Sequence, residues 1–139
     1  MNPAIFLPAL AMVALTFIVL GTMFRRRVAQ MKRDRVHPQA VATSQQAAVL
    51  FTDVAPADNL RNLFEMPVLF YLALVVAAMT AQVTTPVLAL AWAFVAARAL
   101  HSFIHCTYNK VMHRFRAYAL SVFLLLALWC VLGYGLIAG

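Results

Sequence analysis

Residues 66–97 read MPVLFYLALVVAAMTAQVTTPVLALAWAFVAA and carry no charged side chain. The run is 32 residues long, whereas one helix needs only about 20 apolar residues to cross the hydrocarbon core of a bilayer. Near its middle, Gln82, Thr84, Thr85 and Pro86 interrupt the apolar pattern, and polar residues followed by proline favour a turn. The sequence therefore predicts two antiparallel membrane helices joined by a tight turn.

Two more uncharged runs lie outside this pair. Pro3 to Phe24 has 22 residues and Ala117 to Gly139 has 23, each long enough to span a bilayer. The chain is 65% hydrophobic and 11% charged, with a mean hydropathy of +0.86, which places it outside the range of soluble domains. We expect an all-α integral membrane protein in which residues 1–139 form a single four-helix membrane domain.

The predicted bounds follow from caps, prolines and charges. The helices are expected at about residues 3–27, 56–80, 86–110 and 115–138, with a cytoplasmic loop at about 28–55. Within that loop, residues 37–55 are expected to form either a short helix or an irregular cover. Pro67 falls inside the second helix, where it should kink the helix and free a backbone carbonyl about one turn earlier. A neighbouring polar side chain could then bind that carbonyl.

The basic residues predict the orientation. They flank the first and third loops, and they are Arg25, Arg26, Arg27, Lys32, Arg33, Arg35, Arg61, Lys110, Arg114 and Arg116. Because cytoplasmic loops carry the excess of Lys and Arg, we expect both basic loops in the cytoplasm and both termini outside. Membrane topology and anionic headgroups explain the net charge of +7 better than a nucleic-acid partner, which we do not expect. The first helix lacks the pattern of a cleaved signal.

Polar residues recur at helical spacing inside two of the predicted spans. Those of the second span are Asp58, Asn62 and Glu65, and those of the third are Arg98, His101, His105 and Asn109. Spacings of three and four place each set on one helix face. Ionisable groups within membrane spans mark a functional site by default, because burying a charge there is costly.

Three interpretations of this polar stripe remain open. The first is an ion pair between Glu65 and Arg98 that only fixes the helix register. The second is a metal site at His101 and His105, completed by Glu65, with His113 as a further candidate ligand, although Arg98 would repel a cation. The third is an anionic ligand bound by arginine, asparagine and histidine, since the guanidinium fork suits carboxylates and stabilises a thiolate. We expect no bound metal.

Asn62-Leu63-Phe64-Glu65-Met66-Pro67 follows a basic loop, and Ala97-Arg98-Ala99-Leu100-His101 lies in the third span. With these motifs, the chain resembles the MAPEG family, the membrane-associated proteins in eicosanoid and glutathione metabolism, in a bacterial form. The resemblance implies a homotrimer of four-helix protomers in the bacterial inner membrane. It also implies glutathione bound between protomers near the cytoplasmic side, and a lipophilic small molecule or lipid that enters from the bilayer.

The resemblance assigns Asn62, Glu65 and Arg98 to glutathione binding. His101 and Arg26 are further candidates for the same role. The chain differs from many enzymes of the family in two places: it has His101 and His105 where they have tyrosines, and Asp58 where they have an arginine.

The family also implies an arginine near the start of the fourth helix that stabilises the glutathione thiolate. Arg114 and Arg116 both fit this description, and His105 or His101 could donate a proton to the leaving group. The implied activity is conjugation of glutathione to a lipophilic electrophile, or reduction of a hydroperoxide. Whether the chain is catalytic stays open, because a non-catalytic lipid-binding scaffold and an accessory subunit of a membrane complex fit the same residues.

Overall fold

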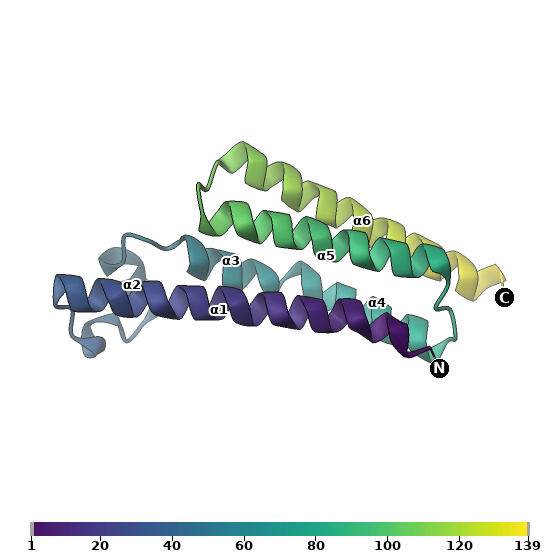
Figure 1. Ribbon diagram of the computed structural model, residues 1–139, viewed down its shortest axis with the longest axis horizontal. Coiled ribbons are helices and arrows are strands. Elements are labelled where there is room, and N and C mark those ends of the chain that lie inside the picture. The colour runs from purple at the N-terminus through teal and green to yellow at the C-terminus, as the bar shows by residue number, and fades with distance from the viewer. Residues whose placement is uncertain (1, 139) are drawn as a thin grey trace.

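The computed structural model of the chain describes residues 2–138, and within that range it contains helices and no strand (Figure 1). The elements are η1 (Pro3–Ile5), α1 (Phe6–Asp34), η2 (Pro38–Val41), α2 (Ser44–Leu50), α3 (Ala55–Leu63), α4 (Met66–Met79), α5 (Thr85–Cys106) and α6 (Val111–Ala138). Four stretches are long and apolar enough to span a membrane, namely Pro3–Asp34, Ala55–Met79, Thr85–Cys106 and Val111–Ala138. The prediction of an all-α membrane protein with four spans is confirmed.

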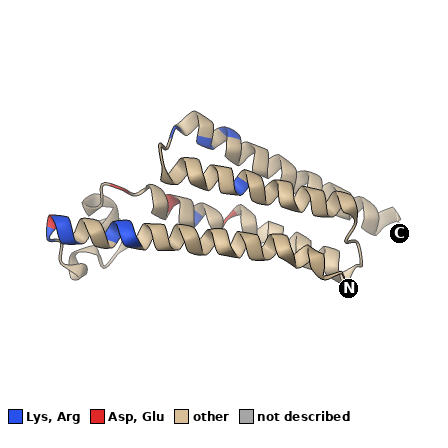
Figure 2. Ribbon diagram, viewed as in Figure 1, with Lys and Arg blue, Asp and Glu red and all other residues tan. Residues whose placement is uncertain are grey.

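The spans form two antiparallel pairs. Helix α1 lies along α3 and α4, and α5 packs over its length against α6 (Figure 1). Both termini lie at one end of the molecule. Most Lys and Arg residues gather at the opposite end, along the last turns of α1 and the first turns of α6 (Figure 2). The molecule is thus polarised along its length.

An apolar core holds the two pairs together. Phe70 of α4 and Phe94 of α5 stack with ring centroids 4.5 Å apart, and both are fully buried. Ala73 and Ala77 of α4 and Ala91 of α5 are also fully buried. Small side chains at these positions let the helix backbones approach closely, which favours van der Waals packing within a bilayer.

Helix α1 continues to Asp34 rather than ending near residue 27, so the loop predicted at 28–55 is shorter. Residues 25–34 contain no proline or glycine, and most are strong helix formers. The helix ends where Arg35 adopts the left-handed conformation with a φ of 54°, followed by Pro38. Helical propensity therefore carries α1 beyond the apolar run.

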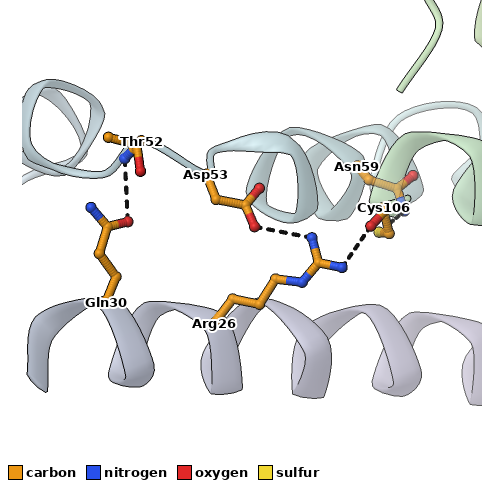
Figure 3. Close-up of polar contacts among 6 residues, drawn as sticks. All are labelled: Arg26, Gln30, Thr52, Asp53, Asn59 and Cys106. Atoms are coloured by element: carbon orange, nitrogen blue, oxygen red, sulfur yellow. Dashed lines mark hydrogen bonds and ion pairs between the residues drawn. The ribbon is translucent and has the colours of Figure 1, made fainter. Parts of the chain in front are cut away.

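The segment between α1 and α3 is ordered by local caps and by contacts to α1. Thr43 and Gln46 form a capping box that starts α2. The buried Gln30 of α1 donates to the carbonyl of Leu50 at 3.2 Å and accepts from the N–H of Thr52 at 3.2 Å; Figure 3 shows the second bond. A short helix, one of the two predicted alternatives, thus forms part of this cover.

The second span is interrupted rather than merely kinked. Helix α3 ends at Leu63 and α4 begins at Met66, with Pro67 in the first turn of α4. Proline lacks an N–H, and its ring clashes with the carbonyl four residues earlier, which here belongs to Leu63. The chain therefore breaks at Phe64 and Glu65, and the break leaves the carbonyl of Asn62 accessible to a side chain from α5.

The connection between the last two spans also differs from the prediction. Helix α5 ends at Cys106 instead of near residue 110, and α6 begins at Val111 instead of near 115. The turn between them contains Asn109 in the left-handed conformation, with a φ of 46°. Asparagine tolerates that region better than most residues, so the turn takes the place of the last helical turn predicted for the third span, and α6 begins one turn earlier than predicted.

Candidate functional site

The polar residues of the third span are buried inside the protein. Arg98, His101, Ser102 and His105 of α5 are at most 3% exposed. They face α3 on one side and the start of α6 on the other. The predicted polar face of the third span is therefore directed at protein, where neighbouring polar groups can bind it.

Arg98 is the most deeply buried charged residue, at 0% exposure. Its Nη2 donates to the carbonyl of Asn62 at 2.9 Å, and its guanidinium lies 5.4 Å from the centroid of the Tyr118 ring. Within residues 2–138, its Nε and Nη1 have no hydrogen-bond partner. A buried guanidinium with unpaired N–H groups is costly, so this side chain is suited to binding an anion.

The Glu65 side chain makes no hydrogen bond or ion pair to this network within residues 2–138. It is exposed at the break between α3 and α4, and no ion pair of the described residues joins it to Arg98. The break accounts for the difference, because α3 ends at Leu63 and Glu65 does not extend the helix face that Asn62 occupies. The interpretation of the stripe as a Glu65–Arg98 pair is therefore not what the structure shows.

Both histidines are directed at Arg114. His101 Nδ1 donates to the carbonyl of Arg114 at 3.2 Å, and His105 Nε2 accepts from Arg114 Nη1 at 3.0 Å, because a guanidinium can only donate. His113 contacts Tyr108 instead. The ring nitrogens of His101 and His105 thus do not converge on a common point, and no group of three His, Cys, Asp or Glu residues suited to a metal occurs in residues 2–138.

Arg114 and Arg116 have different environments. Arg114 is half-buried in the first turn of α6, and its Nη1 binds both His105 and Asn109 Oδ1, the latter at 2.8 Å. Arg116 is exposed. Spacing could not choose between these arginines, because the choice depends on how the turn before α6 aims each side chain.

A cavity of about 210 Å³ with both polar and apolar lining lies beside this network. It is lined by Asn62, His101, Val111, Arg114, Phe115 and Tyr118. Three of the predicted site residues, Asn62, His101 and Arg114, thus come together from three different helices. Arg98 lies behind the cavity, where it contacts both Asn62 and Tyr118.

Arg26 belongs to a different network. Its Nη1 pairs with Asp53 Oδ2 at 3.0 Å, and its Nη2 donates to the carbonyl of Cys106 at 2.6 Å (Figure 3). The Cys106 carbonyl is at the end of α5, where backbone acceptors lack helical partners. Arg26 therefore links α1, the segment before α3 and the end of α5, and these contacts occupy its guanidinium.

Sequence reasoning missed Asn59, which is completely buried. Its side chain accepts from Ser102 Oγ at 3.2 Å and donates to Cys106 Sγ at 3.4 Å. The available signal was its spacing of three residues from Asn62, but the predicted face was drawn through Asp58 instead. Tyr118 was missed as well, because a tyrosine in an apolar span carries no distinctive pattern.

Comparison with known proteins gives one result that covers most of the chain. The sequence profile of the MAPEG family matches residues 5–134. No curated protein and no solved structure matches the chain significantly.

Proposed function

The chain belongs to the MAPEG family, and from that premise we propose that it binds glutathione and transfers it to a lipophilic electrophile, or uses it to reduce a lipophilic hydroperoxide. Membership makes it a membrane protein of the glutathione and eicosanoid metabolism family. The proposal also includes a homotrimer in a bacterial inner membrane, with the basic end in the cytoplasm and both termini outside.

The observation that carries the proposal is the set of donors around the 210 Å³ cavity. Arg114 and His101 line it, and Arg98 lies behind it with two guanidinium nitrogens, Nε and Nη1, that have no partner among the described residues. Glutathione presents two carboxylates and an ionisable thiol, which are groups that arginine binds well. The cavity is smaller than the roughly 300–1,000 Å³ of typical ligand pockets, which supports a site completed by a second protomer.

Arg114 is the arginine that we assign to the thiolate, because it lines the cavity and Arg116 is exposed. Its positive charge favours the ionised thiol. In conjugation, the thiolate sulfur bonds to the electrophilic carbon, and the leaving group departs with its electron pair. In peroxide reduction, the sulfur attacks the terminal oxygen, the O–O bond breaks and the alcohol leaves with a proton. A second glutathione then yields the disulfide and water.

The remaining predicted residues receive different roles in the proposal. Asn62 and Arg98 bind glutathione, and Glu65, exposed at the helix break, is placed to meet a ligand or a neighbouring protomer. His101 lines the cavity, and we assign its Nε2, which has no partner among the described residues, to accept the thiol proton of glutathione and to donate it to the leaving group. We leave Arg26 out of the site because Asp53 and the Cys106 carbonyl occupy its guanidinium.

Calorimetry of glutathione binding to the detergent-purified protein tests this proposal. We expect saturable binding by the wild type, loss of binding in Arg98→Leu and weaker binding in Glu65→Gln. Arg116→Leu is the matched control, since it removes an exposed arginine from the same end of the molecule and should bind normally. Absence of binding by the wild type at millimolar glutathione would refute the proposed site.

A second candidate function rests on a separate apolar groove. It has a volume of about 470 Å³ and is lined by Val13, Thr16, Phe17, Leu20, Leu60, Leu63, Phe64, Val68 and Tyr71. Such a groove suits a lipid chain, and a lipid-binding scaffold would need no thiol chemistry. Binding of a fatty acid without binding of glutathione would favour this non-catalytic function.

A further inference from the structure

We propose that Asn109 is a positioning residue that, together with His105, fixes the guanidinium of Arg114 for its work on the thiolate. We call the pair of acceptors, Asn109 Oδ1 and His105 Nε2, the Arg114 clamp. The clamp rests on the proposed function, because the thiolate role of Arg114 belongs to that proposal. The contacts themselves are independent of any ligand.

The geometry of the Arg114 clamp uses one nitrogen. Nη1 of Arg114 donates to Asn109 Oδ1 at 2.8 Å and to His105 Nε2 at 3.0 Å. A guanidinium Nη carries two hydrogens and accepts none, so the two acceptors satisfy this atom. The side-chain contacts of Arg114 to other described residues involve Nη1 alone. Nε and Nη2 are thus not engaged by those residues.

The backbone explains why asparagine stands at this position. Asn109 adopts a φ of 46°, and its N–H donates to the carbonyl of Ile104 at 2.9 Å, which closes the end of α5. Asparagine tolerates this conformation and also carries a side-chain acceptor. Glycine would provide only the conformation. The turn therefore aims a carboxamide at the first turn of α6, where Arg114 lies.

The chemistry of the two acceptors supports the same role. Both the carboxamide and the imidazole nitrogen that accepts a hydrogen bond are neutral, so the clamp holds the guanidinium without offsetting its charge. Arginine has a long side chain that loses rotamer freedom when it is fixed. Fixing it before glutathione binds leaves its full charge available to the thiolate.

Nitrogen NMR of the Arg114 guanidinium tests the clamp directly, without glutathione. We expect slow rotation and separate Nη signals in the wild type, with Arg114→Lys used for assignment. Asn109→Gly keeps the left-handed turn and removes the shorter of the two hydrogen bonds of the clamp, so rotation should become fast enough to average the signals. Tyr108→Phe is the control in the same turn and should leave them separate. Averaged signals in the wild type, or separate signals in Asn109→Gly, would overturn the clamp.

The thiolate absorbance of bound glutathione tests the consequence. In Asn109→Gly we expect the bound thiol to be half-ionised at a pH about one unit higher, which corresponds to a tenfold loss of thiolate stabilisation. Asn109→Asp separates position from charge: it should keep the NMR signals separate yet raise the half-ionisation pH, because a carboxylate offsets the charge of Arg114. A purely structural Asn109 would leave that pH unchanged in properly folded variants.

The two proposals fail in distinguishable ways. If the wild type shows separate Nη signals but binds no glutathione, the proposed function is wrong and the positioning role falls with it. If glutathione binds and ionises normally in Asn109→Gly, the proposed function stands and the positioning role is wrong. S-methylglutathione, which has no ionisable thiol, should bind the wild type and Asn109→Gly with affinities within about twofold of each other.

Discussion

Three consecutive arginines at the end of α1 have three different environments. Arg25 is exposed, Arg26 binds Asp53 and the Cys106 carbonyl, and the guanidinium of Arg27 lies 5.2 Å from the centroid of the Phe51 ring. Helical geometry separates them, because successive residues point about 100° apart around the axis. The three arginines together indicate the cytoplasmic side of the membrane, but Arg26 also connects α1 to the segment before α3 and to the end of α5.

The link made by Arg26 should contribute to stability. In Arg26→Ala we expect the free energy of unfolding to fall by about 1–2 kcal/mol. Most of this comes from the lost hydrogen bond to the Cys106 carbonyl. The ion pair with Asp53 contributes little, because the arginine side chain is 41% exposed. Thermal unfolding in detergent measures the change. Arg25→Ala should stay within about 0.5 kcal/mol of the wild type, and an equal effect of the two variants would contradict the role of Arg26.

At the scale of helices, the apolar runs and the prolines predicted four spans correctly, whereas several ends were displaced. Hydropathy locates the part of a helix inside the bilayer, but α1 continues beyond it to Asp34 because its sequence favours helix in water as well. The polar face of α5 was predictable from spacing. Asn62 of α3 was also found by spacing, but Glu65 was misplaced, because α3 ends at Leu63 and Glu65 does not continue its helical face.

The break should be needed for the site. Replacing Pro67 by Ala restores an N–H at position 67 and allows a continuous helix, in which the N–H of Met66 competes with Arg98 for the Asn62 carbonyl. We expect glutathione affinity to fall about tenfold, in line with the loss of a hydrogen bond to a charged group. Calorimetry measures it. Pro86→Ala, in the first turn of α5, is the control, and similar losses in both variants would argue against a specific role for the break.

At the scale of the whole molecule, charge and termini lie at opposite ends (Figure 2). The basic end contains the Arg114 clamp and the cavity, so the site lies near the membrane surface that the basic residues define. Few side chains of α1 and α6 are buried within one protomer. The large apolar surface that remains is available to lipid or to other protomers, which agrees with the proposed homotrimer.

The orientation predicts which positions are accessible from each side of the membrane. In a chain whose two cysteines are replaced by serine, a new cysteine at exposed Gln39 should, in the proposed orientation, react with a membrane-impermeant maleimide only after the membrane is opened. A cysteine at exposed Thr84, in the turn between α4 and α5, should react in intact cells. The reverse pattern would place the basic end and the proposed site outside.

The most direct test of the account is a cryo-EM structure of the detergent-purified protein with glutathione. We predict a trimer with glutathione at the basic end, its sulfur beside the Arg114 guanidinium and a carboxylate near Arg98. The distances from sulfur to Nε or Nη2 of Arg114 should be typical of charge-assisted contacts, at roughly 3–4 Å. Glutathione bound elsewhere, or a complete trimer with none at saturating concentration, would contradict the proposed function.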